Sequence, residues 1–202
     1  DLHQSPMYSD LMHEIGWQVE KNGDSQLYYR YLGPLAIAKI QRPKSLDLDW
    51  LQSFRKKHKT LTTYIEPGIT TALPEKRLGF SVEPFAHSCT SLIDLLPTEQ
   101  NILNSFSQKT RYNIVHTFKK SKLTTTTAQL SNLTKEQLTD FFALHSNWSK
   151  QKHVIGYSKE LLTGILNSFP KQGDLHLAYV DNQLVASLLI LYHDSVATYW
   201  AA

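Results

Sequence analysis

The stretch Leu175–Trp200, with the sequence LHLAYVDNQLVASLLILYHDSVATYW, decides the fold of the second half of this chain. It contains three runs rich in branched and aromatic residues, at 175–180, 184–192 and 196–200. Short polar segments separate these runs. Apolar runs of this length joined by polar turns are typical of neighbouring antiparallel strands. The stretch therefore predicts a three-stranded meander.

Two helices are predicted before the meander. Thr134 and Gln137 have the spacing of a capping box, and Leu133 and Leu138 flank it as a hydrophobic staple. The second helix is indicated by apolar residues at helical spacing from Leu161 to Phe169, and a proline ends it. Together with the meander, these helices form a second structural unit.

The first third of the chain is predicted to be a sheet with one helix. Residues 26–31 and 35–40 are rich in strand-forming side chains, and a Gly-Pro turn separates them. Residues 47–59 begin with acids and end with bases, which is the polarity that the helix dipole favours. Residues 60–65 follow as a strand that stops at Glu66–Gly68.

Two helices and a strand complete the first predicted unit. Apolar residues recur at helical spacing over 102–106 and 114–118, which predicts two helices, each with its apolar residues on one face. Residues 123–128 have high strand propensity and are predicted to be the final strand of this unit. We therefore expect an α/β (α+β) chain of two units, residues 1–128 and 129–202. Because the meander reaches the last residue, we expect the second unit to be incomplete.

The composition excludes several classes of protein. Of 202 residues, 41% are hydrophobic and 19% are charged, which excludes collagen-like, disordered and coiled-coil chains. The single cysteine, Cys89, excludes a disulfide framework. No apolar run reaches the roughly 18 residues of a membrane helix, and the first residues do not resemble a signal peptide. We expect a cytoplasmic protein.

Positive charge is concentrated in one segment of the chain. No acidic residue lies between Gln100 and Lys135. The basic residues of this segment are Lys109, Arg111, Lys119, Lys120, Lys122 and Lys135. A local positive field attracts anionic partners such as phosphates or nucleic acid. A solvated helix face without a ligand is an equally simple interpretation.

The strong sequence motifs of cofactor and metal sites are absent. The chain has no glycine-rich dinucleotide loop, no phosphate loop, no His-Glu-x-x-His and no Gly-x-Ser-x-Gly. His145 and His153 have no third metal ligand near them in the sequence. We predict no bound metal and no cofactor.

Five stretches share their pattern with one known family. They are Leu2–Ser5 with Gly16-Trp17, Arg30–Pro34, Tyr64–Pro67, Asp94–Lys120 and the meander 177–202. The most specific is DLLPTEQNILNSFSQKTRYNIVHTFKK, in which an acid and a helix precede Lys-x-Arg-x-Asn-Ile and a basic helix. These stretches resemble the FemABX family, the aminoacyl-tRNA-dependent peptidyltransferases that build peptidoglycan cross-bridges. The resemblance implies two tandem N-acyltransferase-like (GNAT-type) units with mostly antiparallel sheets, the second truncated.

The same resemblance implies an aminoacyltransferase. Such an enzyme moves an amino acid from aminoacyl-tRNA to the amine of a peptidoglycan precursor peptide, with the charged tRNA as co-substrate and no other cofactor. The implied partners are aminoacyl-tRNA and a nucleotide- or lipid-linked muramyl peptide, with peripheral membrane contact through a lipid-linked substrate. Because an ester is already activated, the protein must chiefly align two large substrates and stabilise charge.

Site residues follow from the resemblance as well. Glu66 matches the acid that precedes a proline in the family, where a carboxylate can orient the attacking ammonium or accept its proton. The implied substrate-binding residues are Lys109, Arg111, Lys119, Lys120, Lys152, Tyr157 and Tyr199. The four basic residues within 109–120 suit phosphate groups, because arginine pairs bidentately and lysine acts as a point charge.

Other interpretations stay open from the sequence. Glu66 also fits a plain turn, and Tyr199 also fits core packing. A CoA-dependent N-acyltransferase of the same fold is one alternative function, and it needs a pyrophosphate-binding turn. A non-catalytic nucleic-acid-binding module is another, and it usually has exposed aromatic side chains beside its basic residues. An inactive fragment is the third.

Overall fold

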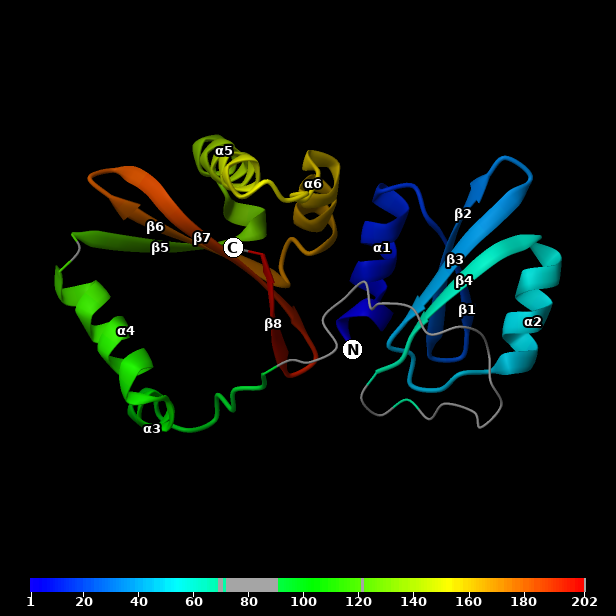
Figure 1. The fold of residues 1–202 in the computed structure, drawn as a ribbon, viewed down its shortest axis with the longest axis horizontal. Helices are drawn as coiled ribbons and strands as arrows, with labels where there is room; N and C mark the ends of the chain where they lie inside the picture. Colours follow the sequence, from blue (N-terminus) through cyan, green and yellow to red (C-terminus); the bar gives the residue numbers. More distant parts are fainter. Residues whose placement is uncertain (69–70, 72–90, 121, 202) are drawn as a thin grey trace.

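Two four-stranded sheets with helices packed on them make up the described part of the chain (Figure 1). The structure is a computed structural model that describes residues 1–68, 71, 91–120 and 122–201. The strand order is β1-β2-β3-β4 in the first sheet and β5-β6-β7-β8 in the second. Among these strand pairs only β3 and β4 run parallel. The predicted α/β class with two mostly antiparallel sheets is confirmed.

The first sheet consists of β1 (Gln18–Asn22), β2 (Ser25–Leu32), β3 (Leu35–Gln41) and β4 (Thr60–Glu66). Tight turns join its first three strands, and Gly23 and Gly33 adopt φ angles of +55° and +63° there, which glycine does without steric cost. Helix α2 (Leu48–Lys57) returns the chain across the sheet, so β4 runs parallel to β3. Asp47 caps α2 by accepting a hydrogen bond from the backbone N–H of Trp50.

The second sheet contains the predicted meander. Its strands are β5 (Leu123–Gln129), β6 (Gly173–Val180), β7 (Gln183–His193) and β8 (Val196–Ala201). β6, β7 and β8 pair antiparallel in sequence order, which confirms the prediction. Helices α5 (Lys135–Lys152) and α6 (Lys159–Ser168) lie on one side of this sheet (Figure 1). The capping box of Thr134 and Gln137 forms as predicted.

The place of β5 corrects one prediction. Residues 123–128 do form a strand, but this strand pairs with β6 of the second sheet and does not close the first. A run of threonines favours extended backbone without specifying a partner strand, so the sequence contained no signal for the correct sheet. A domain division after residue 128 stays a prediction.

Helices α3 (Glu99–Ser105) and α4 (Gln108–Lys120) confirm the two helices that the periodicity predicts. Among their described side chains none is fully buried. Ile102 and Ile114 are half-buried, and Val115 is exposed. In Figure 1 both helices lie apart from the first sheet. Periodicity determines which residues share a face, whereas burial also requires a surface that covers that face.

The N-terminal residues are fixed by capping and by contacts with the first sheet. A short 3-10 helix, η1 (Leu2–Gln4), leads into α1 (Pro6–Glu14), which Ser5 caps by accepting a hydrogen bond from the N–H of Tyr8. The Gln4 side chain accepts a hydrogen bond from the Gln26 N–H at 2.6 Å and donates one to the Gln41 carbonyl at 2.5 Å. Residues 1–4 are thereby held at the ends of β2 and β3. A second 3-10 helix, η2 (Leu130–Asn132), follows β5.

Helix α1 connects the two sheets through one hydrophobic core. Leu11 of α1, Tyr28 of β2, Ile165 of α6 and Leu189 of β7 belong to a single buried cluster. A close approach of α1 to α6 is possible because Gly164 has no side chain: a Cβ there would lie 3.0 Å from Leu11 Cδ1. A smaller separate cluster forms between the first sheet and α2. No helix of the described part is both long and apolar enough to cross a membrane.

The shared core predicts that the two sheets depend on each other for stability. Leu11 is 1% exposed, so Leu11→Ala should lower the free energy of unfolding by about 2–5 kcal/mol. Amide hydrogen exchange should then show a similar loss of protection in β6 and β7, although Leu11 belongs to the N-terminal segment. Leu61→Ala is the matched control, because Leu61 is 65% exposed. Unchanged protection of β6 and β7 in Leu11→Ala would contradict a shared core.

Candidate functional site

Glu66 lies where the two parallel strands of the first sheet end side by side. Its Oε2 accepts a hydrogen bond from Gln41 Nε2 at 3.1 Å, and its Oε1 is 3.6 Å from Arg42 Nε. Gln41 ends β3 and Glu66 ends β4, so the parallel pairing of these strands brings the three side chains together. Arg42 has a φ angle of +48°, a left-handed conformation that is uncommon for a residue other than glycine. Such backbone strain is found preferentially at functional sites.

The N-terminal segment adds polar groups to this carboxylate. Tyr8 donates a hydrogen bond from its hydroxyl to Gln41 Oε1 at 3.2 Å, so the Gln41 amide links Tyr8 to Glu66. Asp1 Oδ2 lies 3.7 Å from Arg42 Nη1, and Asp1 Oδ1 lies 2.9 Å from His3 Nδ1. The Arg42 guanidinium is therefore shared between two carboxylates.

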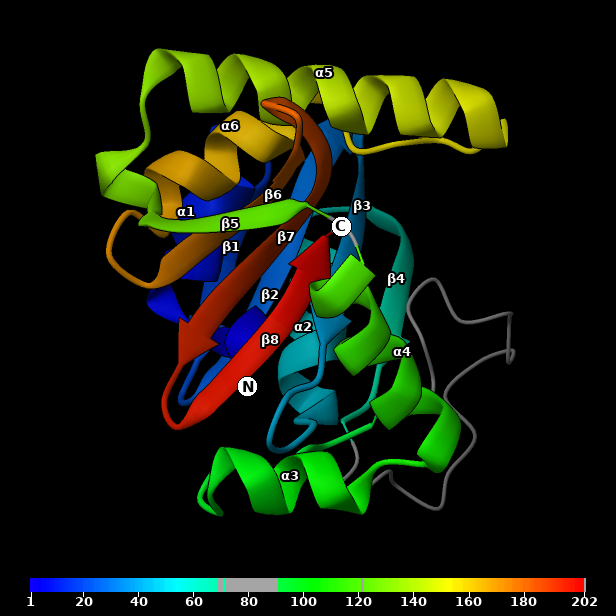
Figure 2. The same cartoon turned by 90° about the vertical axis from the view of Figure 1, so that its left-hand side faces the viewer.

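The second sheet closes the other side of the site. The Trp200 ring of β8 lies 6.1 Å from the Tyr8 ring and 6.2 Å from the His3 ring, measured between centroids. Tyr157 donates a hydrogen bond from its hydroxyl to the Trp200 carbonyl at 3.4 Å. Figures 1 and 2 both show the N-terminal segment beside β8. We refer to His3, Tyr8, Gln41, Arg42, Glu66 and Trp200 together as the Glu66 site.

Burial perturbs the titration of several groups in and around the Glu66 site. Burial and then the Arg42 charge lower the pKa of His3 to about 4, although Glu66 opposes them. Burial raises the pKa of Tyr8, and the Glu66 charge raises it further. Burial lowers the pKa of Lys39 to about 8, with Arg30 acting in the same direction and Glu66 against it. Several perturbed groups close together are typical of functional sites.

Lys39 extends the site along the first sheet. Lys39 and Gln41 are two residues apart on β3, so they lie on the same face of the sheet, and their partners on β4 are Tyr64 and Glu66. The Lys39 Nζ lies 5.0 Å from the centroid of the Trp17 ring. The face near Glu66 thus combines a carboxylate, an amine with a lowered pKa and a neutral histidine. Such a set can bind, orient and deprotonate an ammonium group.

Of the predicted basic residues on α4, the two with described side chains, Lys109 and Arg111, do not contribute to the Glu66 site. Lys109 is exposed on α4, which Figure 1 shows apart from the first sheet. Arg111 donates hydrogen bonds from Nη1 to the carbonyls of Asn104, at 3.1 Å, and Phe106. Its guanidinium therefore stabilises the turn between α3 and α4. Lys119 and Lys120 end α4, and their side chains lie outside the described residues.

Of the three residues predicted in the second unit, Tyr157 lies against the Glu66 site. Its backbone N–H donates to His145 Nε2 at 3.0 Å, and its ring stacks on the His145 ring with centroids 5.5 Å apart. These contacts fix Tyr157 after α5. Tyr199 precedes Trp200 on β8 and is 66% exposed, which is not the core packing that the sequence left open. Lys152 is exposed in the last turn of α5, and no contact with the Glu66 site is found for it.

Several residues of the Glu66 site were not predicted from the sequence. The sequence contained a usable signal for Arg42: a charged residue followed by proline ends two predicted strands, at Arg42-Pro43 and at Glu66-Pro67. His3 and Tyr8 had none, since contacts of η1 and α1 with residues far away in the sequence bring them to these strand ends. In the described part, no three His, Cys, Asp or Glu side chains are grouped as a metal site would require.

Comparisons with known proteins identify a fold. No protein-family model and no curated protein matches the sequence. Among solved structures, one described as "Crystal structure of FemX" superimposes with a TM-score of 0.62 over 90% of this chain, at 18% sequence identity. The chain has the FemX fold. The resemblance to the FemABX family is thereby confirmed at the level of the fold, and the chain spans about half, 53%, of the FemX structure.

The Arg42 charge predicts a measurable change at His3. The substitution Arg42→Gln should raise the pKa of His3 above about 4, because the positive charge of the Arg42 guanidinium disfavours protonation of the His3 ring. Titration of the His3 ring protons by NMR measures this shift, and Lys44→Gln, which removes an exposed cation, is the control. In the wild type, the pKa of His3 is lower in the folded state than in the unfolded state. The contribution of neutral His3 to the free energy of unfolding is therefore complete above about pH 6.5 and is lost as the pH falls toward 4. An unchanged His3 titration in Arg42→Gln would refute this electrostatic coupling.

Proposed function

We propose that the Glu66 site takes part in aminoacyl transfer from aminoacyl-tRNA to the amine of a peptidoglycan precursor peptide. The observation that carries the proposal is the Glu66 carboxylate, held between Gln41 and Arg42 where the two sheets approach each other in a FemX-like fold. The site is polar on the side of the first sheet and aromatic on the side of β8. This arrangement suits an amine flanked by less polar groups.

In the proposed reaction Glu66 positions the attacking nitrogen. An ammonium on the acceptor peptide donates a hydrogen bond to the carboxylate and transfers a proton to it. The neutral nitrogen attacks the ester carbonyl, a C–N bond forms, and the C–O bond to the tRNA ribose breaks. The ribose oxygen takes up one proton, and the second proton lost by nitrogen leaves through Glu66 to solvent. Arg42 and Gln41 keep the carboxylate in one orientation throughout.

One further feature supports a ligand at this place. Lys39 lies beside Glu66 on the same sheet face, and its pKa of about 8 leaves a large neutral fraction at slightly alkaline pH. A neutral amine next to Glu66 does not repel an incoming ammonium.

The proposed donor is a charged tRNA, which we place in the cytoplasm, and the proposed acceptor is a nucleotide- or lipid-linked muramyl peptide. A lipid-linked acceptor would bring the protein to the membrane surface through its substrate. Lys109, Lys119, Lys120 and Lys122 are the proposed contacts for tRNA phosphates, and Arg111 acts chiefly on the α3–α4 turn.

The transfer reaction gives the direct test. Glu66→Gln should lower the rate of amide formation from aminoacyl-tRNA by about 10²–10⁴-fold, because the amide accepts no proton. Glu136→Gln, on the exposed first turn of α5, is the matched control and should leave the rate unchanged. The assay uses radiolabelled aminoacyl-tRNA and a lysine-containing muramyl peptide, with an acyl-CoA as the alternative donor. Transfer from acyl-CoA alone would overturn the tRNA proposal.

The basic residues of α4 are tested by the salt dependence of tRNA binding. Lys109→Ala should weaken binding and reduce the slope of log affinity against log salt by about 0.7–0.9, the value for one lost phosphate contact. Lys21→Ala removes an exposed lysine of β1 and should leave the slope unchanged. Filter binding at several salt concentrations measures both variants. Equal slopes for Lys109→Ala and the wild type would exclude Lys109 as a phosphate contact.

A further inference from the structure

The end of α5 and the segment that joins it to α6 expose a group of large apolar side chains. Val154 is 47% exposed, and the next residue, Ile155, is as exposed as a side chain in an extended peptide. Trp148 and Tyr157, on either side of this pair in the sequence, are 43% and 42% exposed. Single exposed apolar residues are common, whereas a group of them marks a place of interaction. We refer to Trp148, Val154, Ile155 and Tyr157 as the apolar tip.

Hydrogen bonds and ring stacking fix the apolar tip on the end of α5. The backbone N–H of Val154 donates to the Ser149 carbonyl at 3.1 Å. The rings of Trp148 and Tyr157 both stack on the His145 ring, with centroids 6.0 Å and 5.5 Å away. The aliphatic pair is therefore presented by a turn that is already held in one conformation, so its binding to a partner costs little conformational entropy.

The charges that accompany the apolar tip are positive. From residue 141 to residue 159 the sequence contains no acidic residue and three lysines, Lys150, Lys152 and Lys159. All three are exposed, and none of them forms an ion pair within the part of the chain that the structure describes. Two lie in the last turn of α5 and one begins α6, so they flank the tip on both sides. Glu160, which follows this stretch, offsets only one of the three charges.

The end of α5 projects away from the sheets. Figure 2 shows the last turns of this helix extending past the strands, and the segment after them running back along the helix. A flat surface can therefore approach the projecting end without first meeting the sheets. The base of the tip also contacts the Glu66 site, because the Tyr157 hydroxyl donates a hydrogen bond to the Trp200 carbonyl.

This combination of groups fits an anionic lipid surface better than a nucleic acid or a protein. Nucleic acids are bound by basic and aromatic side chains, and exposed aliphatic side chains add little to contacts with phosphates. The apolar centres of protein interfaces are depleted of lysine. A bilayer offers acyl chains to aliphatic side chains and anionic headgroups to lysines, and tryptophan and tyrosine prefer the boundary between these two layers.

We propose that the apolar tip docks directly on an anionic lipid bilayer. Val154 and Ile155 enter the boundary between headgroups and acyl chains, and the three flanking lysines pair with anionic headgroups. The contact is made with the lipids themselves, so it differs from recruitment through a lipid-linked substrate. Only one consequence rests on the proposed function: docking holds the Glu66 site close to the surface on which a lipid-linked acceptor lies.

Binding to vesicles tests the proposal without any substrate. The chain is sedimented with vesicles of phosphatidylcholine alone, or of equal parts phosphatidylcholine and phosphatidylglycerol. Binding to the vesicles with phosphatidylglycerol should be at least about 10-fold tighter, because each lysine near an anionic surface contributes about 5-fold in affinity. Added salt should weaken this binding, since it screens the exposed lysines.

One substitution tests the aliphatic part of the tip. Ile155→Glu should weaken binding to the anionic vesicles by at least about 10-fold, because it removes an inserted apolar side chain and adds a repelled charge. Leu61→Glu is the matched control: it makes the same kind of change at a residue of β4 that is 65% exposed, and it should bind as the wild type does. Both side chains are exposed, so both variants should keep the fold, as circular dichroism checks.

A double substitution tests the lysines. Lys150→Gln/Lys152→Gln should weaken binding to the anionic vesicles by about 20-fold. Lys21→Gln/Lys56→Gln removes two exposed lysines of the first sheet and α2, and it should weaken binding much less. In the wild type the tryptophan emission should shift to shorter wavelength on binding, and Trp148→Phe should remove most of that shift.

Three outcomes overturn the proposal. The first is no binding of the wild type to anionic vesicles, and the second is equal weakening by Ile155→Glu and Leu61→Glu. The third is self-association in solution that Ile155→Glu abolishes, without any vesicle binding, which would assign the tip to a second copy of the chain. Because the vesicles contain no muramyl peptide and no tRNA, failure of the transfer reaction leaves these results unaffected.

Discussion

The packing of α1 on α6 is the contact on which the Glu66 site depends. Leu11 of α1 lies over Gly164 of α6, so the two helix axes approach closely and one apolar core extends through both sheets. This packing also fixes the N-terminal residues between the ends of β3 and β8. A Cβ on Gly164 would lie 3.0 Å from Leu11 Cδ1, so the Leu11 side chain would have to move to accommodate it.

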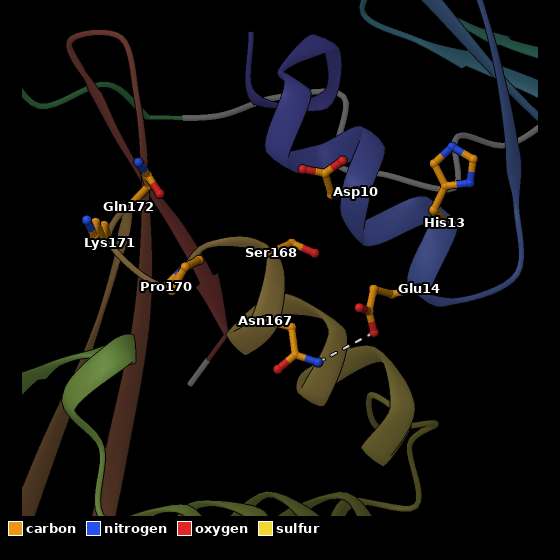
Figure 3. A pocket seen from close by; sticks show the side chains of 8 residues that line it. All are labelled: Asp10, His13, Glu14, Asn167, Ser168, Pro170, Lys171 and Gln172. Carbon is orange, nitrogen blue, oxygen red and sulfur yellow. Dashed lines mark hydrogen bonds between the residues drawn. The ribbon is translucent and has the colours of Figure 1, made fainter.

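Helix α1 presents different chemistry on its different faces. Its first turn directs Tyr8 toward Gln41, which bonds to Glu66, and at its last residue Glu14 accepts a hydrogen bond from Asn167 of α6 (Figure 3). The buried Leu11 and Met12 separate these two polar regions. A nine-residue helix thus positions a group for the carboxylate-centred site and also contacts α6.

At the Glu66 site, electrostatics and hydrogen bonding act together. Glu66 and Asp1 flank the Arg42 guanidinium, and burial keeps His3 neutral and Tyr8 protonated over the physiological pH range. The Glu66 carboxylate thus lies next to one cation, Arg42, and close to two side chains that burial keeps neutral. In our proposal Glu66 receives the ammonium of a substrate, and the fixed orientation of this carboxylate serves the alignment that acyl transfer requires.

The sequence by itself determined the local structure and the fold class. Strand runs, capping residues and helical periodicity predicted the meander, α5, α6 and the end of β4 at Glu66, because these features depend on neighbours within a few residues. Only the tertiary structure decided that β5 pairs with β6, that α3 and α4 lack a covering surface, and that Arg42, His3 and Trp200 surround Glu66. These contacts join residues up to about 200 positions apart, and no local propensity encodes which distant surface a helix or strand will meet.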